Sequence, residues 1–277
     1  MRHDPGACGI HPETAGKFEE LIRILGRHEG LVVLFSGGVD STLLAKAAFL
    51  ALGSRAVALT FRSPLEDPSE TEGASRAAKR IGIRHVNLVS DDLAVPEIFQ
   101  NSRDRCYACR KHRDALALGW ARQNGFEAVV DGFSVSDLED YRPGRKAADE
   151  DGIGHPLLEA GLGREEIVEL SRGSGLEGWD RKGSPCLATR FPIGTLLSEE
   201  ALARVARAEA ALRGLGFSPV RVRTYPGQVA VVETNDPPGI MARRDQVLSL
   251  LEEAGFSRAL VDLEGYRRGR MNAPPSP

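Results

Sequence analysis

The chain has 277 residues, 42% of them hydrophobic, and a formal net charge of −3 at pH 7. This length and composition suit one large or two smaller globular domains, and the charge gives no overall attraction to nucleic acid or to an anionic membrane. No apolar stretch approaches the roughly 20 residues that a membrane span needs, and the four cysteines are typical of reactive or metal-binding thiols in a reducing compartment. We therefore expect a cytoplasmic protein with neither a membrane nor nucleic acid as its partner.

Apolar strands alternate with helices along the first part of the chain. The pattern predicts helices over 14–27, 41–52, 69–81 and 107–123, and strands over 31–35, 55–60, 84–89 and 127–131. This alternation favours an α/β fold with a doubly wound, mostly parallel sheet, whose ligands bind at the carboxyl ends of the strands. Ser36, Thr60 and Asp131 fall at such ends. The polar stretch from Ser134 to Gly154 is expected to be a long functional loop.

The segment Ser36-Gly-Gly-Val-Asp-Ser41 joins the first strand to the next helix. Gly37 and Gly38 let the backbone turn sharply and bring its N–H groups to an anion, which the helix N-terminus also attracts. A Walker-type loop would have a lysine directly before the Ser or Thr at the helix start, whereas the nearest lysine is Lys46, a full turn inside the helix. The segment therefore predicts a phosphate loop of another type, with an ordinary strand–turn–helix as the alternative.

From about residue 198 the pattern changes to that of a small α+β domain. It predicts helices over 199–213 and 239–253, strands over 219–224, 228–233 and 258–263, and a hairpin turn at Tyr225-Pro-Gly227. The expected organisation is a nucleotide-binding domain over 15–195, the small domain over 196–268 and a disordered tail over 269–277.

Cys186 lies in a loop with two prolines and two glycines, flanked by Lys182 and Arg190. Nearby positive charge favours the thiolate, which is the nucleophilic and metal-binding form of cysteine. Cys186 is therefore the candidate for sulfur chemistry, and the alternative is a buried structural thiol.

Cys106 and Cys109 form a C-x-x-C pair at the start of a helix, while Cys8 receives no role. Two thiolates at this spacing can converge on one metal, and Cys186 would be a third ligand of an iron–sulfur centre with an open coordination position. Zinc competes for the site, because His112 would complete a Cys3His set, and a lone C-x-x-C is also compatible with a redox pair.

Glu209 falls in the middle of an apolar helix face. An unpaired buried carboxylate is costly, so it is expected to meet a cation, a metal, or Arg221 and Arg223, with a solvated rim position as the alternative. Arg221 and Arg223 alternate with valines, so both guanidinium groups leave one face of a strand. Such a pair suits a phosphate group, or else it belongs to a solvated outer face of the sheet.

Six segments carry a wider resemblance: S-G-G-V-D-S, Asp131-Gly132, Asp137 to Gly144, Pro156 to Gly161, Trp179-Asp180, and Ser184 to Pro192 around Cys186. Together they resemble the LarE-type ATP-dependent sulfur transferases of the PP-loop ATP pyrophosphatase superfamily. The resemblance runs from about residue 15 to 265, and its cysteine motif is more specific than its ATP loop.

The resemblance implies that ATP adenylates a carboxylate of pyridinium-3,5-biscarboxylate mononucleotide, and that this group becomes a thiocarboxylate of the nickel-pincer cofactor of lactate racemase and related enzymes. Mg²⁺ would accompany ATP, and the protein would form trimer-based homo-oligomers, commonly hexamers. Together with the strand-end residues, the predicted ATP ligands are Ser36, Gly37, Gly38, Asp40, Ser41, Thr60, Asp131 and Gly132. The predicted sulfur-transfer residue is Cys186, and the predicted substrate contacts are Arg190, Glu209, Arg221, Arg223 and Glu233.

The chain departs from the resemblance in its cysteines. In members with one active cysteine, that residue gives up its own sulfur and becomes dehydroalanine, so each protein acts once. Because this chain adds Cys106 and Cys109, we hypothesise that they and Cys186 bind a [4Fe–4S] cluster that carries sulfide from an external donor. The alternatives are a sacrificial Cys186 with ATP and Mg²⁺ alone, a tRNA 2-thiolation enzyme, or a nucleotide- or metal-carrier protein without catalysis.

Overall fold

The structure is a computed structural model that describes residues 9–138, 143–177 and 185–267. The chain divides into two compact units, here called the first and the second unit. The first consists of Met1–Ser63, Pro68–Ser90 and Cys106–Ser184, and the second of Pro64–Asp67, Asp91–Arg105 and Pro185–Pro277. No helix in the described ranges is both long enough and apolar enough to cross a bilayer.

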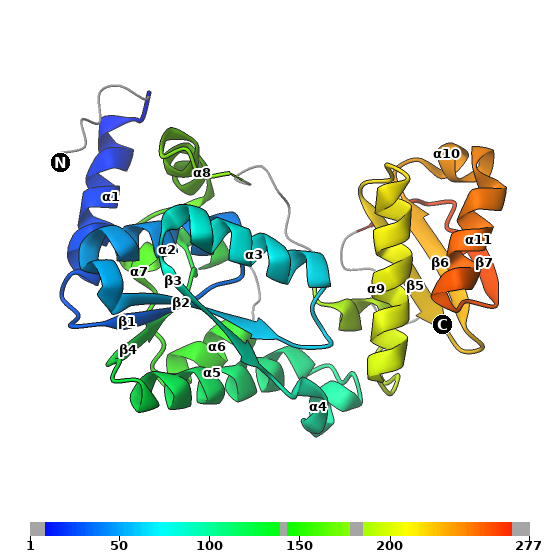
Figure 1. The fold of residues 1–277 in the computed structure, drawn as a ribbon, viewed down its shortest axis with the longest axis horizontal. Coiled ribbons are helices and arrows are strands. Elements are labelled where there is room, and N and C mark those ends of the chain that lie inside the picture. The colour runs from blue at the N-terminus through cyan, green and yellow to red at the C-terminus, as the bar shows by residue number, and fades with distance from the viewer. Residues whose placement is uncertain (1–8, 139–142, 178–184, 268–277) are drawn as a thin grey trace. The chain divides into compact units, whose positions relative to one another are not determined.

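Four parallel strands form the sheet of the first unit, in the order β3-β2-β1-β4 (Figure 1). The strands are β1 (Leu31–Leu34), β2 (Ala56–Arg62), β3 (Arg84–Val89) and β4 (Ala128–Val130). Val32 on β1 lies opposite Val57 on β2 and Val129 on β4. The chain runs outward from β1 to β3 and then returns to place β4 on the other side of β1, which confirms the predicted α/β, doubly wound fold.

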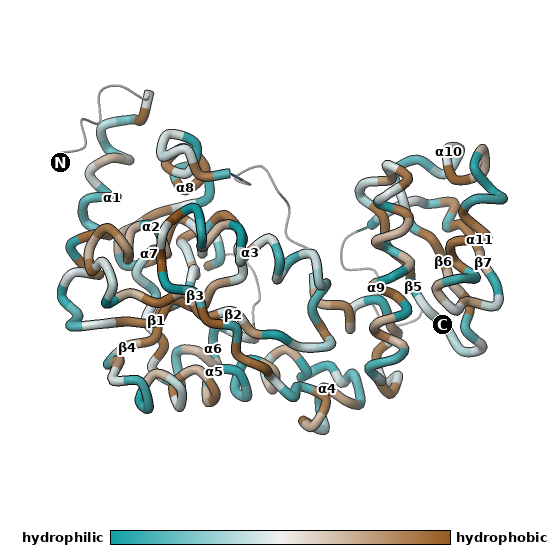
Figure 2. The backbone as a smooth tube through the Cα atoms, in the orientation of Figure 1, coloured by the Kyte–Doolittle hydropathy of each residue, from teal (hydrophilic) through white to brown (hydrophobic). Residues whose placement is uncertain are grey.

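Helices cover both faces of this sheet, and the alternation of side chains along β1 explains how. The helices are α1 (Pro12–Leu25), α2 (Val39–Leu52), α3 (Pro68–Ile81), α5 (Arg105–Gln123), α6 (Pro143–Asp151), α7 (Pro156–Glu159) and α8 (Arg164–Gly173). Leu31 and Val33 pack in the core that includes α1, α2 and α8, whereas Val32 packs with Ala117 of α5 and Ala148 of α6. Strands buried on both faces read as continuous apolar runs, as β1 does in Figure 2.

The prediction of a long functional loop over 134–154 is wrong for the described part of that segment. A short 3₁₀ helix forms over Val135–Leu138, and α6 begins at Pro143. Ala147 and Ala148 on α6 are fully buried, so this otherwise polar helix has one apolar face against the core. Residues 139–142 lie outside the described ranges.

The second unit is an α+β fold whose three strands have the order β5-β6-β7. Its elements are a 3₁₀ helix (Asp92–Ala94), α4 (Pro96–Phe99), a 3₁₀ helix (Leu187–Arg190), α9 (Glu199–Gly214), β5 (Val220–Tyr225), β6 (Val229–Thr234), α10 (Pro237–Ala242), α11 (Arg244–Ala254) and β7 (Arg258–Val261). β5 and β6 form the predicted antiparallel hairpin, while β7 runs parallel to β6. The helix predicted over 239–253 is two helices, because Arg243 leaves the helical conformation at φ −109° and ψ 28°.

Candidate active site

The phosphate loop lies where β1 ends and α2 begins, next to the point at which the strand order reverses. Gly37 has φ +75°, and a Cβ atom there would lie 2.8 Å from Cα of Ala74 on α3, so only glycine fits. Ser36 Oγ lies 3.1 Å from Ser41 Oγ and accepts a hydrogen bond from Gly38 N–H at 3.3 Å. These contacts hold the loop curved at the N-terminus of α2, which is the arrangement that binds phosphate through backbone N–H groups.

Asp40 and Gly132 border the phosphate loop. The carboxylate of Asp40 is paired with Arg164 at the start of α8, whose Nη1 lies 3.2 and 3.3 Å from the two oxygens. Burial raises the pKa of Asp40, and the charge of Arg164 opposes this rise. Gly132 follows β4, and a Cβ atom there would lie 3.0 Å from the amide nitrogen of Ser41, so β4 brings its end close to the loop.

Arg164 is a residue that the sequence analysis missed. A cation in the first turn of a helix opposes the helix dipole, so its place at the start of α8 is unfavourable by itself. Asp40 compensates the charge, although Arg164 remains about half exposed, with 47% of its side chain accessible. An Asp40–Arg164 pair beside a phosphate loop supplies a carboxylate for a divalent cation and a guanidinium for a phosphate.

Thr60 was predicted at the end of a strand, but β2 continues to Arg62, so Thr60 lies inside the strand and its hydroxyl is already engaged. Thr60 Oγ1 donates to the carbonyl of Phe35 at 2.6 Å and lies 2.8 Å from Nε2 of His85. Since the hydroxyl proton goes to Phe35, Nε2 of His85 acts as the donor to Thr60. Burial lowers the pKa of this histidine. Thr60 thus supports the residue that precedes the phosphate loop.

Asp131, after β4, lies at the centre of a buried ionic network. Its Oδ2 accepts from Arg110 of α5 at 2.7 Å, and its Oδ1 lies 2.7 Å from Nδ1 of His155. His155 Nε2 lies 3.1 Å from Asp149 of α6, and Arg110 also pairs with Asp114. Burial alone would raise the pKa of Asp131, but the hydrogen bond to His155 and the charge of Arg110 hold this pKa below its usual value. The bond to Asp131 raises the pKa of His155.

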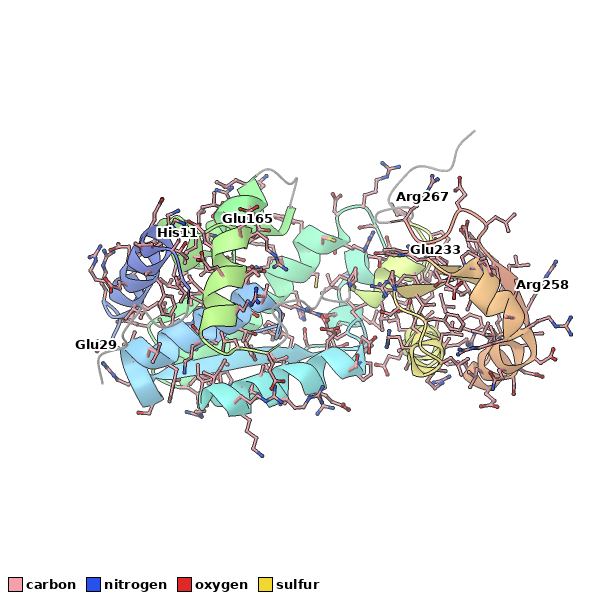
Figure 3. The ribbon with its side chains drawn as sticks, turned by 90° about the horizontal axis from the view of Figure 1, so that it is seen from above. His11, Glu29, Glu165, Glu233, Arg258 and Arg267 are labelled. Atoms are coloured by element: carbon pink, nitrogen blue, oxygen red, sulfur yellow. The ribbon has the colours of Figure 1, made fainter. Side chains whose placement is uncertain are left out.

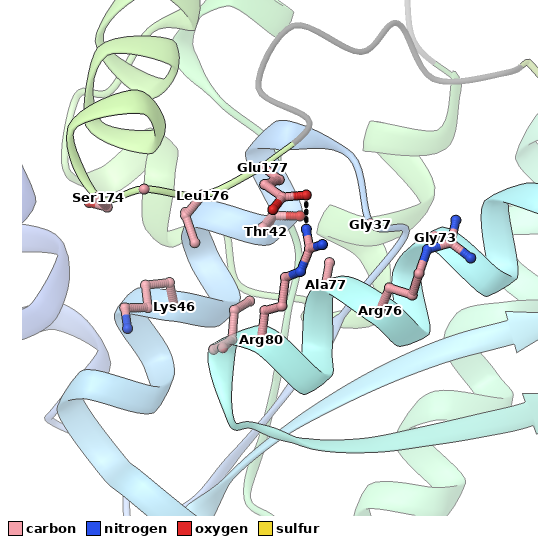
Figure 4. A pocket seen from close by; sticks show the side chains of 12 residues that line it. Gly37, Thr42, Lys46, Gly73, Arg76, Ala77, Arg80, Ser174, Leu176 and Glu177 are labelled. Atoms are coloured by element: carbon pink, nitrogen blue, oxygen red, sulfur yellow. Dashed lines mark ion pairs between the residues drawn. The ribbon is translucent and has the colours of Figure 1, made fainter.

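A pocket of about 210 Å³ adjoins the phosphate loop in the first unit (Figure 4). Gly37, Thr42 and Lys46 line it from the loop and α2, and Arg76 and Arg80 from α3. Arg80 forms an ion pair with Glu177, the last described residue before 185, across this pocket (Figure 4). Of the charged side chains in the lining, three are cationic and one is anionic, so the pocket carries a positive excess beside the phosphate loop.

In the second unit, the loop that carries Cys186 is fixed through its backbone. The amide of Leu187 donates to the carbonyl of Leu65 at 2.8 Å, and Arg190 Nη1 donates to the carbonyls of Pro185 and Cys186 at 2.8 and 3.2 Å. The Thr189 hydroxyl also donates to the Cys186 carbonyl, at 2.7 Å. The Cys186 side chain is half-buried, so a well-held backbone presents a partly accessible thiol.

Arg190 is itself held by Glu209 on α9. Both side chains are 0% exposed and form a two-pronged pair, with Nε to Oε1 and Nη2 to Oε2 both at 2.9 Å. Oε1 of Glu209 also accepts from the Val222 amide at 3.0 Å. The inward-facing position predicted for Glu209 is therefore what the structure has, and its main partner is Arg190. A fully buried pair of this kind positions the cysteine loop, while direct contact of either residue with substrate stays a prediction.

Arg221 and Arg223 lie on β5 with different partners. Arg223 is buried, donates to Glu233 at 2.8 Å and to the carbonyl of Thr189 at 2.7 Å (Figure 3 labels Glu233 on β6). Its Nε has no acceptor in the part of the chain that the structure describes. Arg221 lies 3.9 Å from Glu209, and burial, followed by the charge of Arg190, lowers its pKa.

Cys106 and Cys109 occupy the first turn of α5 in the first unit, three positions apart and hence on one helix face. Both are thiols, exposed and half-buried respectively, while Cys186 belongs to the second unit. Within the described ranges, no three His, Cys, Asp or Glu side chains are grouped so as to hold a metal ion. His112 Nε2 is buried without a described partner, but His112 does not join such a group either. The first unit thus offers two thiols that are spaced to bind one metal ion together, but no third ligand is grouped with them in the described ranges.

Several predicted features lie outside the described residues. These are Cys8, Trp179-Asp180, Lys182, the start of the cysteine loop up to Ser184, and the tail over 269–277.

Comparison with known proteins agrees with this geometry. The asparagine synthase family profile matches residues 27–106, which contain the phosphate loop. An uncharacterized protein of Synechocystis is 39% identical over 262 residues, which are 92% of this chain and 97% of the relative. Pyridinium-3,5-bisthiocarboxylic acid mononucleotide synthase of Lactiplantibacillus plantarum is 34% identical over 261 residues, or 93% and 94% of the two chains. An uncharacterized protein of Methanocaldococcus jannaschii is 25% identical over 241 residues, or 87% and 92%.

The doubly wound sheet, the phosphate loop at its switch point and the matching profile define an ATP-using enzyme of the PP-loop class. Within that class, the relationship over nearly the whole chain is decisive: this protein belongs to the LarE-type family of ATP-dependent sulfur transferases. It is an adenylating sulfurtransferase.

Proposed function

We propose that this protein uses ATP to convert the carboxylates of pyridinium-3,5-biscarboxylate mononucleotide into thiocarboxylates during synthesis of the nickel-pincer nucleotide cofactor. The proposal rests on one combination of features. The chain joins a phosphate loop to a thiol loop held by a buried Arg190–Glu209 pair, and it aligns over 93% of its length with the Lactiplantibacillus plantarum synthase. Neither the substrate nor the sulfur source follows from the phosphate loop alone.

The first step is adenylation. An oxygen of the substrate carboxylate attacks the α-phosphorus of ATP, the bond to the β-phosphate oxygen breaks, and pyrophosphate leaves with its electron pair. The N–H groups of the Ser36–Ser41 loop would hold the phosphates, and the Asp40 carboxylate would bind Mg²⁺. Arg164, now paired with Asp40, would then bind a phosphate oxygen. The acyl-adenylate carries AMP as its leaving group.

The second step is sulfur transfer. A sulfur nucleophile attacks the acyl carbon, and AMP leaves with the carbon–oxygen bond electrons. In the sacrificial route, Cys186 Sγ forms a thioester, a base removes the Cα proton of Cys186, and cleavage of its Cβ–Sγ bond leaves the thiocarboxylate and dehydroalanine. Arg190, by holding the carbonyls of Pro185 and Cys186, would keep this thiol aligned through the reaction.

A catalytic route requires a replaceable sulfur. We propose Cys106, Cys109 and Cys186 as three thiolate ligands of a [4Fe–4S] cluster, which when bound would supply an exchangeable sulfide at its fourth iron. Thiolate chemistry and the C-x-x-C spacing on α5 support this assignment. Sulfide or another small donor would be the second substrate.

The substrate phosphate is assigned to β5. Arg221 has little compensating charge, and the Nε–H of Arg223 has no described acceptor, so both can donate to a phosphate oxygen. Cytoplasmic location and a trimer-based homo-oligomer, with the hexamer common in the family as one such assembly, complete the proposal. Light scattering at several protein concentrations tests the assembly.

The test compares the full-length protein with Cys186→Ala and Cys106→Ala, all purified without oxygen. With ATP, Mg²⁺ and substrate, we expect all three to release pyrophosphate, because no thiol takes part in adenylation. Only the unmodified protein should form thiocarboxylate repeatedly in the presence of sulfide, and only it should contain iron and acid-labile sulfide.

The outcomes separate the parts of the proposal. Absence of substrate-dependent pyrophosphate release from the unmodified protein would overturn the adenylation. Repeated turnover by Cys106→Ala would exclude the cluster, and a single turnover with loss of hydrogen sulfide mass at Cys186 would establish the sacrificial route.

A further inference from the structure

Arg221 is a cation whose charge is only weakly compensated. In the described chain, Glu209 is the one carboxylate within ion-pair distance, at 3.9 Å, and both its oxygens already accept hydrogen bonds from Arg190. Arg213 is a third cation near the same carboxylate, at 3.6 Å. Arg213, however, has a carboxylate partner of its own in Asp67, at 2.7 Å, so the charge of Glu209 is divided mainly between Arg190 and Arg221, which leaves Arg221 able to attract an anion.

The partner that does lie over Arg221 is an aromatic ring. The guanidinium carbon is 5.6 Å from the centre of the Tyr266 ring, within the range of a cation–π contact. Of the guanidinium N–H groups, Nη1 donates to the carbonyl of Val220 at 2.8 Å. A carboxylate partner would neutralise the charge and occupy the donors, whereas a ring restrains the group and leaves its charge and most N–H groups for a ligand.

The chain after β7 is built to bring Tyr266 to this place. The Asp262 amide continues the pairing to Val232 at 3.0 Å, and Asp262 Oδ1 then accepts from the Glu264 amide at 2.9 Å. Gly265 has φ +72°, and a Cβ atom there would lie 2.9 Å from the carbonyl oxygen of Thr234. Only glycine permits this close crossing over the end of β6, and the next residue is Tyr266.

We propose that Tyr266 is a positioning residue for phosphate recognition. Its ring restrains the Arg221 guanidinium so that the N–H groups left unused by the protein bind the phosphate monoester of a nucleotide-like substrate. Tyr266 acts through Arg221 rather than on the reacting carboxylate. This inference rests on the proposed function, because it specifies how the substrate phosphate is held.

The experiment measures binding of two probes to the full-length protein by calorimetry. The probes are nicotinic acid mononucleotide and the corresponding riboside, which share the pyridinium carboxylate and differ in the phosphate. The ratio of their dissociation constants reports the contribution of the phosphate. The variants are Tyr266→Phe, which keeps a ring, Tyr266→Leu and Tyr266→Gln, which do not, and Tyr225→Leu as a control at an exposed tyrosine of the same unit.

We expect the unmodified protein, Tyr266→Phe and Tyr225→Leu to favour the mononucleotide by the same factor. Tyr266→Leu and Tyr266→Gln should reduce that factor roughly tenfold while leaving riboside binding unchanged. In turnover, both should raise KM for the mononucleotide substrate and leave kcat nearly unchanged, because the ring touches no reacting atom. Using two non-aromatic variants keeps the test valid if one of them does not fold.

Two results would overturn the inference and distinguish its failure from that of the proposed function. If the non-aromatic variants keep the full phosphate-dependent factor, the role of Tyr266 is excluded and the phosphate site on β5 stands. If the unmodified protein binds both probes equally, the phosphate site itself is excluded, and the role of Tyr266 with it.

Discussion

Gly37 is under two separate constraints, a positive φ and the close approach of α3. Gly125 has nearly the same φ, +76° against +75°, but nothing lies within 4 Å of a Cβ atom there. Gly125→Ala should therefore cost only the conformational penalty of about 1 kcal/mol, whereas Gly37→Ala should cost more, because the backbone of Ala74 must also move. Urea denaturation measures both, and Gly37→Ala should additionally weaken ATP binding. Equal urea midpoints for the two variants would show that α3 moves away from the added methyl group without a loss of stability.

Glu209 is the carboxylate on which the cysteine loop depends. Glu209→Gln leaves the fully buried Arg190 without its charge partner, so the free energy of unfolding should fall by about 3–5 kcal/mol. Glu200→Gln on the same helix is the matched control, because Glu200 is 80% exposed and pairs with Arg204 in solvent, where such a pair contributes about 1 kcal/mol or less. Similar urea midpoints for the two variants would contradict the structural role of Glu209.

At the residue scale, sequence predicts motifs better than it predicts partners. The Ser36–Ser41 loop is contiguous, so its chemistry is visible in one segment. Arg190 and Glu209 were both predicted as site residues, but their pairing depends on how α9 packs against the cysteine loop, and no local pattern encodes that. Arg164 had no signal except an arginine where a helix begins, which is informative only once Asp40 is known to be its neighbour.

The ionic network around Asp131 joins α5, the end of β4 and α6, and it makes the first unit sensitive to pH. The bond to Asp131 raises the pKa of His155, so the folded protein holds that proton more tightly than the unfolded chain does. The resulting stabilisation is fully present below the unfolded pKa of about 6.5 and is lost as the pH rises through the folded value.

We therefore expect the urea midpoint of the unmodified protein, measured relative to that of His155→Gln, to fall as the pH rises from 6 to 9. Circular dichroism at fixed ionic strength provides the measurement. Parallel pH profiles for the two proteins would show that His155 does not contribute to this dependence.

Helices and strands with a strong apolar pattern were predictable from the sequence, whereas helices with few apolar residues or with an internal break were not. The strands of the first sheet match their predicted positions to within two residues at each end, because residues buried on both faces form unbroken apolar runs. The helix α6 was not predicted, because only Ala147 and Ala148 face the core of the first unit and the residues around them in the sequence are charged. The break between α10 and α11 was missed because nothing in the residues around Arg243 interrupts the helical pattern.

The chain passes between the two units five times. Two of the segments that the second unit gains in this way, 91–105 and the one that begins at 185, are joined by the side chain of Asn101. Its Nδ2 donates to the carbonyls of Ala188, Phe191 and Pro192 at 3.5, 3.2 and 2.9 Å. These bonds fix the 91–105 segment to the loop that carries Cys186. The sequence gives no sign of this association, because the two segments are about 90 residues apart and neither has an apolar period.

Asn101→Ala should lower the free energy of unfolding by about 1–3 kcal/mol, since three carbonyls lose their donor and two of these hydrogen bonds are buried. Sulfur transfer should fall more than pyrophosphate release, because the cysteine loop loses its support. Asn124→Ala is the control, as Asn124 is exposed, directly follows α5, and its side chain donates to the carbonyl of Trp120 on that helix. An equal loss in the two reactions would show that Asn101 does not act on the cysteine loop selectively.

The distance along the chain between Asn101 and its acceptors also has a consequence for biosynthesis. Asn101 is synthesised 90 residues before Phe191. At a translation rate of about 5–20 residues per second, this is a delay of roughly 5–18 s. Until Ala188, Phe191 and Pro192 have been made, the Asn101 side chain lacks the carbonyl acceptors that fix the 91–105 segment. The second unit therefore completes its folding only after the cysteine loop has been made.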